Sequence, residues 1–478
     1  MRSSMGRAAL VLSFALLAGC ATPGSERPQS KLLEKADVGI PAERAAVPAA
    51  SRAWWTVLGD EQLARLIGSA LRDSPDLAAA QARVRRAAQL EAIARGAARP
   101  DLSANAHASR ERFSGSYIYP PPLGGGWITD TRATLDFDYD FDFWHRHEAL
   151  ISASALRTGA AQAQAEEARL VLSVAVASSY AALQADLETL AIAKQRERTG
   201  ERLAAIEQER VRRGLAPQSL AEARVAALDG VREDAAGIEG RARLRQNELA
   251  ALCGRPAEKW QDVAPSHLQL PEALSEPRSL PADFLGRRPD LQAGRYLVEA
   301  SLQDAAAARA QFYPNVNLAA FFGLQSIGLD QLLQGRSRTF GAGPALHLPL
   351  FSQGTLRAEL GAHYADYDLA VEAYNRSLLD AVREVADRGA ELESAAKRID
   401  AAARSLAALR SSAHASEVRR QRGLSGDTQL LESRAAVLDE ERSLAALRSA
   451  QFQAAIGLVK AMGGAYGTEH KRDGDGRE

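Results

Sequence analysis

Residues 131–144, TRATLDFDYDFDFW, restrict the possible folds of this chain more than any other stretch. The odd-numbered positions from 133 to 143 are apolar, whereas Asp136, Asp138, Asp140 and Asp142 occupy even-numbered positions. Alternate side chains of a strand point to opposite faces, so an extended segment would have one apolar and one anionic face. A half-buried strand of a soluble sheet is one interpretation. Four carboxylates at alternate positions favour a second interpretation, a membrane β-barrel strand whose aspartates face an aqueous lumen.

A helix of unusual length is expected after this strand. Residues 148–213 contain no proline and are rich in alanine, leucine, glutamate and arginine. At 1.5 Å per residue, such a helix would be roughly 95–100 Å long. Within it Val176, Tyr180, Leu183 and Leu187 recur at steps of four and three, the spacing of a coiled-coil seam. A membrane strand therefore leads into a helical rod of periplasmic dimensions.

The N-terminus indicates export. Arg2 and Arg7 precede an apolar run over residues 8–18, so residues 1–19 are interpreted as a signal peptide. The sequence Leu-Ala-Gly before Cys20 is similar to the lipobox of bacterial lipoproteins, in which the cysteine becomes the lipidated first residue of the mature protein. Ala21 favours, by the same resemblance, delivery to the outer membrane. Residues 20–53 are rich in proline and alanine and are expected to form a lipidated tether.

Composition narrows the class of protein further. The formal net charge is −1 with basic and acidic residues interleaved, which gives no indication of a nucleic-acid partner. With Cys20 lipidated, Cys253 has no second cysteine to pair with in the chain. After the signal peptide, the sequence shows no apolar run long enough to predict a membrane-spanning helix. If the chain crosses a membrane, we expect it to do so with β-strands.

The chain is predicted to contain two similar halves. Residues 74–101 align without a gap on residues 288–315, an offset of 214, and each copy has a helix, a proline and then a strand. The Arg-Gly-Leu turn at Gly214 and Leu215 recurs at Gly423 and Leu424, an offset of 209. These repeats predict two long helical hairpins, each with glycine at its turn.

Domain boundaries follow from the repeats. The first repeat is expected over residues 54–254, with strands near 102–113 and 131–143 and a long helical hairpin. A proline-rich linker over 255–285 precedes the second repeat, 286–464, with strands near 315–324 and 339–350 and another hairpin. The charged tail, 465–478, is expected to be disordered.

Four strands per chain are too few to close a membrane barrel, because the smallest closed barrels have about eight. An open edge in lipid would leave backbone groups unpaired. The predicted fold is therefore a mixed one, in which several chains share a membrane β-barrel and their long helices form an α-helical barrel.

These motifs together resemble the TolC-type outer membrane factors, in the NodT-like lipoprotein branch that serves resistance-nodulation-division (RND) efflux systems. The resemblance covers nearly the whole mature chain. It rests on the order of the lipobox at Cys20, Trp54-Trp55, Asp60-Glu61-Gln62-Leu63, the paired Pro-Asp-Leu helices, Asp142-Phe143-Trp144, Pro349-Leu350-Phe351, both turns and Lys460-Ala461-Met462-Gly463-Gly464. Three positions depart from the family pattern: His145 replaces a glycine, and Ala465-Tyr466 replaces glycine and tryptophan.

The resemblance implies a homotrimer in the bacterial outer membrane, lipid-anchored and extending into the periplasm. Its helical tips would dock to a periplasmic adaptor (membrane fusion protein) and an inner-membrane RND pump. The implied function is passive export of small molecules through a tripartite multidrug efflux pump. Two alternatives stay open, namely the outer membrane conduit of a type I secretion system and a non-conducting coiled-coil scaffold lipoprotein.

Candidate functional residues fall into four groups. Asp427 and Arg422 are expected to form charged rings at a periplasmic gate, unless Asp427 only caps the last helix and Arg422 is solvated. Exposed leucines at turns are natural anchors, so Gly214, Leu215, Gly423 and Leu424 are expected to contact the adaptor. The four aspartates would make the barrel lumen cation-favouring. The expected interfacial aromatic belt consists of Phe143, Trp144, Phe312, Tyr313 and Phe351.

The sequence lacks the common enzymatic motifs. The chain has no Gly-x-Ser-x-Gly, no Walker-type phosphate loop and no dinucleotide-binding glycine pattern, so neither an enzyme nor a cofactor is predicted. His145 and His147 could in principle bind a metal, but polar aromatic residues are common at a strand-to-helix junction, and no metal site is predicted. The exported substrate is not specified by the sequence.

Overall fold

A computed structural model describes residues 23–34, 37, 53–116, 118–260, 263–266, 268, 270–271, 284–349 and 351–464. The predicted signal peptide, Cys20, most of the tether, part of the linker and the charged tail lie outside these residues. The chain divides into two compact units. The first combines Met1–Leu32, Arg83–Ala161 and Ala293–Tyr374, and the second combines Leu33–Ala82, Gln162–Gln292 and Asn375–Glu478.

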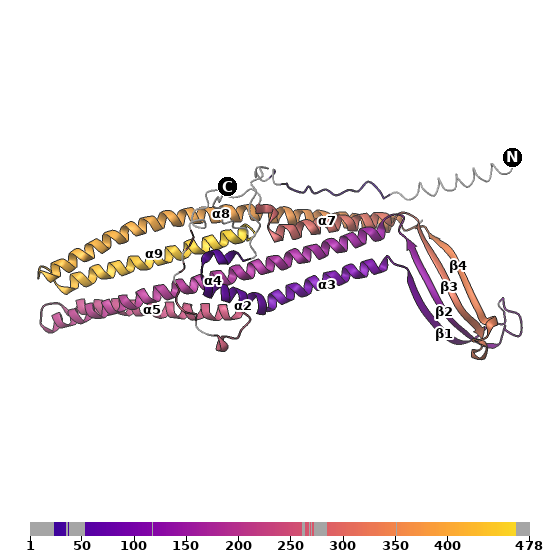
Figure 1. Ribbon diagram of the computed structural model, residues 1–478, viewed down its shortest axis with the longest axis horizontal. Helices are drawn as coiled ribbons and strands as arrows, with labels where there is room; N and C mark the ends of the chain where they lie inside the picture. The colour runs from indigo at the N-terminus through magenta and orange to yellow at the C-terminus, as the bar shows by residue number, and fades with distance from the viewer. Residues whose placement is uncertain are drawn as a thin grey trace, which may run out of the picture. The chain divides into compact units, whose positions relative to one another are not determined.

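The first unit contains a four-stranded antiparallel sheet in the order β1-β2-β3-β4 (Figure 1). Its strands are β1 (Asp101–Arg112), β2 (Trp127–Phe141), β3 (Asn315–Ile327) and β4 (Arg338–His347). Relative to the expected ranges, β2 begins four residues earlier and ends two earlier, and β4 ends three earlier. Short 3-10 turns, η5 (Leu329–Gln331) and η6 (Gly335–Ser337), occupy the β3–β4 loop.

The strand register separates the side chains into two faces, because residues directly opposite each other share a face. On one face, Leu102 of β1 lies opposite Phe137 of β2, and Leu135 lies opposite Phe322 of β3. On the other face, Ser103 lies opposite Asp136. One face is therefore apolar and the other polar. Within the described sheet, β1 and β4 each have one unpaired edge.

The long helices form two hairpins (Figure 1). One consists of α4 (Arg146–Arg212) and α5 (Gln218–Leu252), and the other of α8 (Gln353–Gln421) and α9 (Asp427–Ala461). With 67 and 69 residues, α4 and α8 are each roughly 100 Å long. These rods and the sheet confirm the predicted fold class. Shorter elements complete the chain: η2 (Trp54–Leu58), α2 (Glu61–Asp73), α3 (Pro75–Ala97), η3 (Ala257–Lys259), η4 (Phe284–Gly286) and α7 (Pro289–Ala310).

The predicted seam of α4 is a core element of the second unit. Val176, Tyr180 and Leu183 are each 0% exposed. Contrary to the sequence analysis, α4 also contains an 18-residue stretch whose length and mean hydropathy, 1.5, fit a membrane span. That stretch is 56% buried inside the protein. A core helix that is surrounded by other helices is as apolar as a membrane span, so burial accounts for this composition. Cys253, at the end of α5, is also fully buried, and burial raises the pKa of its thiol to about 11.

The described part of the predicted tether, residues 23–34, is held by α8. In the first unit, the backbone amides of Gln29 and Ser30 both donate to Oδ1 of Asp368 at 2.9 Å. In the second unit, the amide of Leu33 donates to Oδ1 of Asn375 at 2.8 Å. Side chains of α8 thus hold the backbone of a segment whose composition indicated an extended tether.

Candidate functional site

Both helical hairpins turn through a left-handed glycine. The φ angle is 68° at Gly214 and 71° at Gly423, a conformation that costs other residues roughly 1–2 kcal/mol. The amide of the next residue, Leu215 or Leu424, donates to a carbonyl five positions earlier at 2.8 Å, which closes a Schellman-type helix end. Leu215 is 67% exposed and Leu424 is 73% exposed, so each turn presents an apolar side chain to solvent.

Charged side chains form a chain across the second turn. Arg434 of α9 lies 2.6 Å from Glu417 of α8, and Glu417 lies 3.7 Å from Arg420. Arg420 in turn donates from Nε to the carboxylate of Asp427. Asp427 therefore pairs within the chain with Arg420, whereas Arg422 is exposed and forms no salt bridge among the described residues. The suggestion that Asp427 caps α9 is wrong, because Gly426 is the N-cap and Asp427 is the first helical residue.

Three further salt bridges join the two hairpins inside the second unit. Arg442 of α9 lies 2.7 Å from Asp234 of α5, and Arg196 of α4 lies 3.0 Å from Asp439 of α9. Arg224 of α5 pairs with Glu432 of α9. Every partner is more than a quarter exposed, so each pair contributes only about 0–1 kcal/mol. Weak links of this kind can hold two helices together without preventing their separation.

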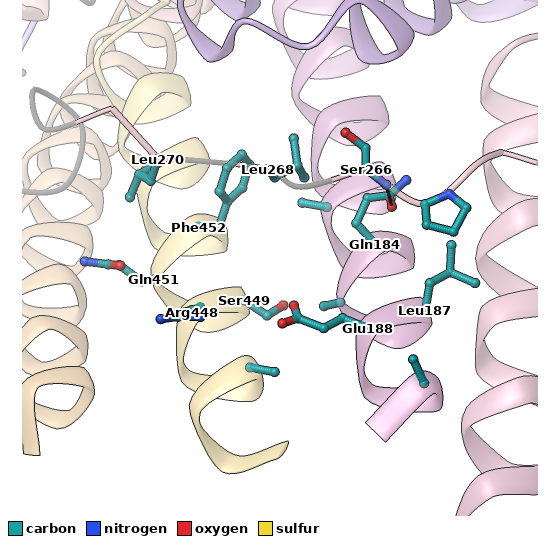
Figure 2. A pocket seen from close by; sticks show the side chains of 15 residues that line it. Gln184, Leu187, Glu188, Ser266, Leu268, Leu270, Arg448, Ser449, Gln451 and Phe452 are labelled. Carbon is teal, nitrogen blue, oxygen red and sulfur yellow. Dashed lines mark hydrogen bonds between the residues drawn. The ribbon is translucent and has the colours of Figure 1, made fainter. Parts of the chain in front are cut away.

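A cleft of about 890 Å³ lies between α4, α9 and a loop segment that includes Ser266 and Leu268 (Figure 2). Gln184 fixes this segment: its Nε2 donates to the carbonyl of Ala264 at 3.1 Å, and its Oε1 accepts from the amide of Ser266 at 2.7 Å. Glu188 and Arg448 are the charged residues of the lining, which contains no histidine or cysteine. The described lining thus shows none of the constellations used for nucleophilic catalysis.

A half-buried polar network explains the Asp-Glu-Gln-Leu motif. The hydroxyl of Tyr180 donates to Oδ2 of Asp60 at 3.0 Å, and the hydroxyl of Ser266 donates to the same oxygen at 2.7 Å. Oδ1 of Asp60 accepts from the amide of Leu63 at 2.8 Å and caps α2. Burial, followed by the bond to Asp60, raises the pKa of Tyr180 to about 12. Burial opposes ionisation of Asp60, but its hydrogen bonds outweigh burial and lower its pKa.

The polar face of the sheet carries three of the four predicted lumen aspartates. Asp136 accepts from Nδ2 of Asn105 at 2.8 Å, and Nδ2 of Asn315 donates to Asp140 at 3.2 Å. Asp138 lies opposite Asp101 of β1, a carboxylate that the sequence analysis did not include. Like charges placed directly opposite each other destabilise a sheet, so this pairing lowers the stability of the anionic face.

Asp142 has a different position from the other three aspartates. It lies beyond the end of β2, and its carboxylate accepts from the amides of His147 at 3.0 Å and Glu148 at 2.9 Å. These amides belong to the first turn of α4, which has no intrahelical acceptors for them. Asp142 thus caps the N-terminus of α4 and is not part of the polar face of β2.

Most of the predicted aromatic belt lies at the junction between sheet and helices. The ring of Trp144 stacks on Tyr313 with a centroid distance of 4.5 Å, and its Nε1 donates to the carbonyl of Pro314 at 2.9 Å. Phe143 is 62% exposed and Phe351 is fully exposed. These side chains can contact an interface between lipid and water.

Phe312 does not belong to this belt, and its assignment there is wrong. Its side chain is 0% exposed and packs with Ala308 of α7 and Leu360 of α8. Tyr364 of α8 covers the same cluster. Phe312 therefore joins α7 to α8 as a core residue.

The two histidines of the junction bind different carboxylates. Nδ1 of His145 lies 2.7 Å from Glu148, whereas Nε2 of His147 lies 3.0 Å from Asp140. His145 has a φ of 57°, which gives a physical reason for glycine in the family pattern at this position. Among the described residues, no group of three or more His, Cys, Asp or Glu side chains is arranged to hold a metal ion.

A buried arginine missed by the sequence analysis links α7, α8 and α9 in the second unit. Arg288, 8% exposed at its side chain, lies 2.7 Å from Asp290 and 2.9 Å from Glu384, and it donates to the carbonyl of Ala461 at 2.9 Å. Burial and the charge of Asp290 raise the pKa of nearby Glu167. The repeat of the Pro-Asp-Leu motif drew attention to this region, but Ser74 occupies the equivalent position in the first half.

A sheet with one apolar and one anionic face, continued by helical rods of roughly 100 Å, is the architecture of an outer membrane channel subunit. The sequence profile of outer membrane efflux proteins matches residues 66–255 and 280–464. The chain belongs to this family of outer membrane efflux proteins, which confirms the resemblance to TolC-type factors and the outer membrane location.

Individual relatives agree with this assignment. The multidrug resistance outer membrane protein MdtP of Escherichia coli O6:H1 is 32% identical over 422 residues, 86% of each chain. The fusaric acid resistance protein FusA of Burkholderia cepacia is 30% identical over 76% of this chain and 69% of its own. Among solved structures, the outer membrane protein VceC of Vibrio cholerae is 31% identical with a TM-score of 0.79, covering 87% of this chain and 99% of VceC.

Proposed function

We propose that three copies of this protein form the outer membrane conduit of a tripartite efflux pump, which receives small molecules from an adaptor and an inner-membrane RND pump. The observation that carries the proposal is the four-stranded sheet with unpaired edges at β1 and β4. Backbone groups at such edges need partners in lipid, and neighbouring copies supply them by closing one barrel. A non-conducting scaffold would not account for an apolar face on this sheet.

The substrates that we propose are small organic compounds. Relatives are named for multidrug resistance and for fusaric acid resistance. We also propose lipidation of Cys20, which lies outside the described residues, because its lipobox-like sequence would add acyl anchors to the barrel.

Single-channel recording tests the conduit and the role of its anionic face together. In a planar bilayer, the detergent-purified protein should give discrete openings with a preference for cations, and its mass in solution should be that of a trimer. Asp136→Asn, Asp138→Asn and Asp140→Asn combined should lower the cation-to-anion permeability ratio, because rings of carboxylates set cation selectivity. Asp142→Asn is the matched control, since this side chain caps α4. A monomeric or silent protein would contradict the proposed function.

We propose that the gate lies where the hairpins turn, with Asp427 and Arg422 at the second turn. Combined Arg422→Ala and Asp427→Ala should raise the open probability roughly ten- to hundredfold, because three copies each lose interactions worth up to about 1 kcal/mol. The change also releases Arg420 from Asp427. The control is Glu393→Ala with Lys397→Ala, an exposed pair of α8 at 2.6 Å. Unchanged open probability would remove Asp427 and Arg422 from the gate.

A further inference from the structure

The apolar face of the sheet carries charge at one end only. The register assigns to this face the even-numbered residues of β1, β3 and β4 and the odd-numbered residues of β2. Its charged residues are Arg110, Arg112 and Arg338, and no acidic residue of the four described strands lies on it. The opposite face, by contrast, mixes aspartates with Arg132 and histidines.

All three arginines lie at the end of the sheet that carries the loops. Arg110 and Arg112 follow Leu102 by eight and ten positions on β1, and Arg338 precedes Leu346 by eight positions on β4. A tilted strand crosses the hydrocarbon layer in about 9–11 residues. With the two leucines at one boundary of the bilayer, the arginines therefore reach the other boundary. A charge costs little free energy there, in contrast to the midplane.

These arginines have no acidic partner in the described part of the chain. All three side chains are exposed, and Arg112 donates from Nε to the carbonyl of Gly125 at 3.1 Å. Glu111, its neighbour in sequence, faces the opposite side of the sheet. Trp127, 66% exposed, lies opposite Arg112 on the same face. Indole rings at this depth are typical of the headgroup layer.

We infer that Arg110, Arg112 and Arg338 bind the phosphate groups of outer-leaflet lipid. A guanidinium binds phosphate through two parallel hydrogen bonds, and the absence of acidic neighbours on this face leaves that capacity available. Phe322 and Phe340, which lie opposite each other and are 59% and 78% exposed, supply an apolar surface for the acyl chains next to Arg338. The inference rests on the proposed function: a conduit subunit whose helices α4 and α8 extend into the periplasm from one end of the sheet has the loops of the other end at the outer surface.

The test uses a bis-phosphorylated, acylated glucosamine disaccharide lipid as the probe and native mass spectrometry of the full-length protein in detergent. Arg110→Gln, Arg112→Gln and Arg338→Gln combined should weaken binding about tenfold or more. Arg83→Gln, Arg85→Gln and Arg86→Gln on α3 remove the same charge from exposed arginines and should leave binding unchanged. The dephosphorylated lipid should bind the unaltered protein as weakly as the phosphorylated lipid binds the sheet variant.

Equal binding of the phosphorylated lipid by the sheet variant and the α3 variant would overturn the inference. Displacement of the lipid by millimolar inorganic phosphate would also overturn it, because it would indicate a free-anion site. Conductance of the sheet variant separates this inference from the proposed function. Normal channel openings of the sheet variant together with weakened lipid binding would support the lipid site. If the unaltered protein binds the lipid but shows no channel openings, the proposed conduit function is contradicted and the lipid site is not.

Discussion

Replacement of Arg288 by alanine is expected to lower the free energy of unfolding by about 3 kcal/mol, because it leaves Asp290 and Glu384 without their buried counter-ion. The value is at the lower end for a broken buried ion pair, since these carboxylates are 30% and 31% exposed. The carbonyl of Ala461 also loses its donor. Chemical denaturation followed by helical circular dichroism, with the protein in detergent, measures the change.

The control for this effect is an arginine of α7, the helix that begins directly after Arg288. Arg295 lies 3.3 Å from Glu299 but is 66% exposed, so Arg295→Ala should change stability by less than about 0.5 kcal/mol. Adding Glu384→Gln to Arg288→Ala should recover part of the loss, because it removes a carboxylate whose remaining counter-ion is Lys460 at 3.8 Å. Equal stability of the Arg288 and Arg295 variants would show that the buried cluster does not hold α7 to α8 and α9.

Charged substitutions at both turns should abolish adaptor docking. Central apolar anchors contribute about 2 kcal/mol or more each, so Leu215→Glu with Leu424→Glu is expected to weaken the association roughly a thousandfold. The measurements are co-purification of the adaptor from membranes and drug susceptibility of cells that depend on this protein. Trimer assembly should persist, since both side chains point into solvent.

Leu333 provides the matched control for the turn leucines. It is 87% exposed in the β3–β4 loop of the other unit, so Leu333→Glu makes the same chemical change outside the helical turns. Docking that survives the double turn substitution would place the adaptor contact elsewhere. Loss of docking with Leu333→Glu as well would point to a defect of the whole assembly.

Local patterns were sufficient to predict the elements of this fold. Alternation in residues 131–144 located β2, and the register placed its apolar and polar residues on opposite faces as expected. The four-three spacing of Val176, Tyr180 and Leu183 identified a fully buried seam. Glycine after a long helix identified both left-handed turns. Each of these signals depends on residues close together in the chain.

Contacts between distant segments account for the errors. Phe312 and Tyr313 are adjacent aromatic residues before a proline, and packing against Leu360 and Tyr364 of α8 buries Phe312. At shorter range, Asp427 pairs with Arg420 of α8 across the turn, whereas Arg422 follows the last residue of that helix. Arg288 meets Glu384 across 96 positions, a separation over which no periodic pattern in the sequence extends.

The free edges of β1 and β4 also have a consequence for biogenesis. Because each unpaired peptide group would cost several kcal/mol in hydrocarbon, one protomer cannot enter the bilayer alone and wait for others. For the proposed trimer, insertion and assembly would then have to occur as one event, after the three chains have met. A chain with a damaged edge strand would then prevent closure of every barrel that it joins. Mutant alleles that encode such a chain should therefore be genetically dominant over the intact gene.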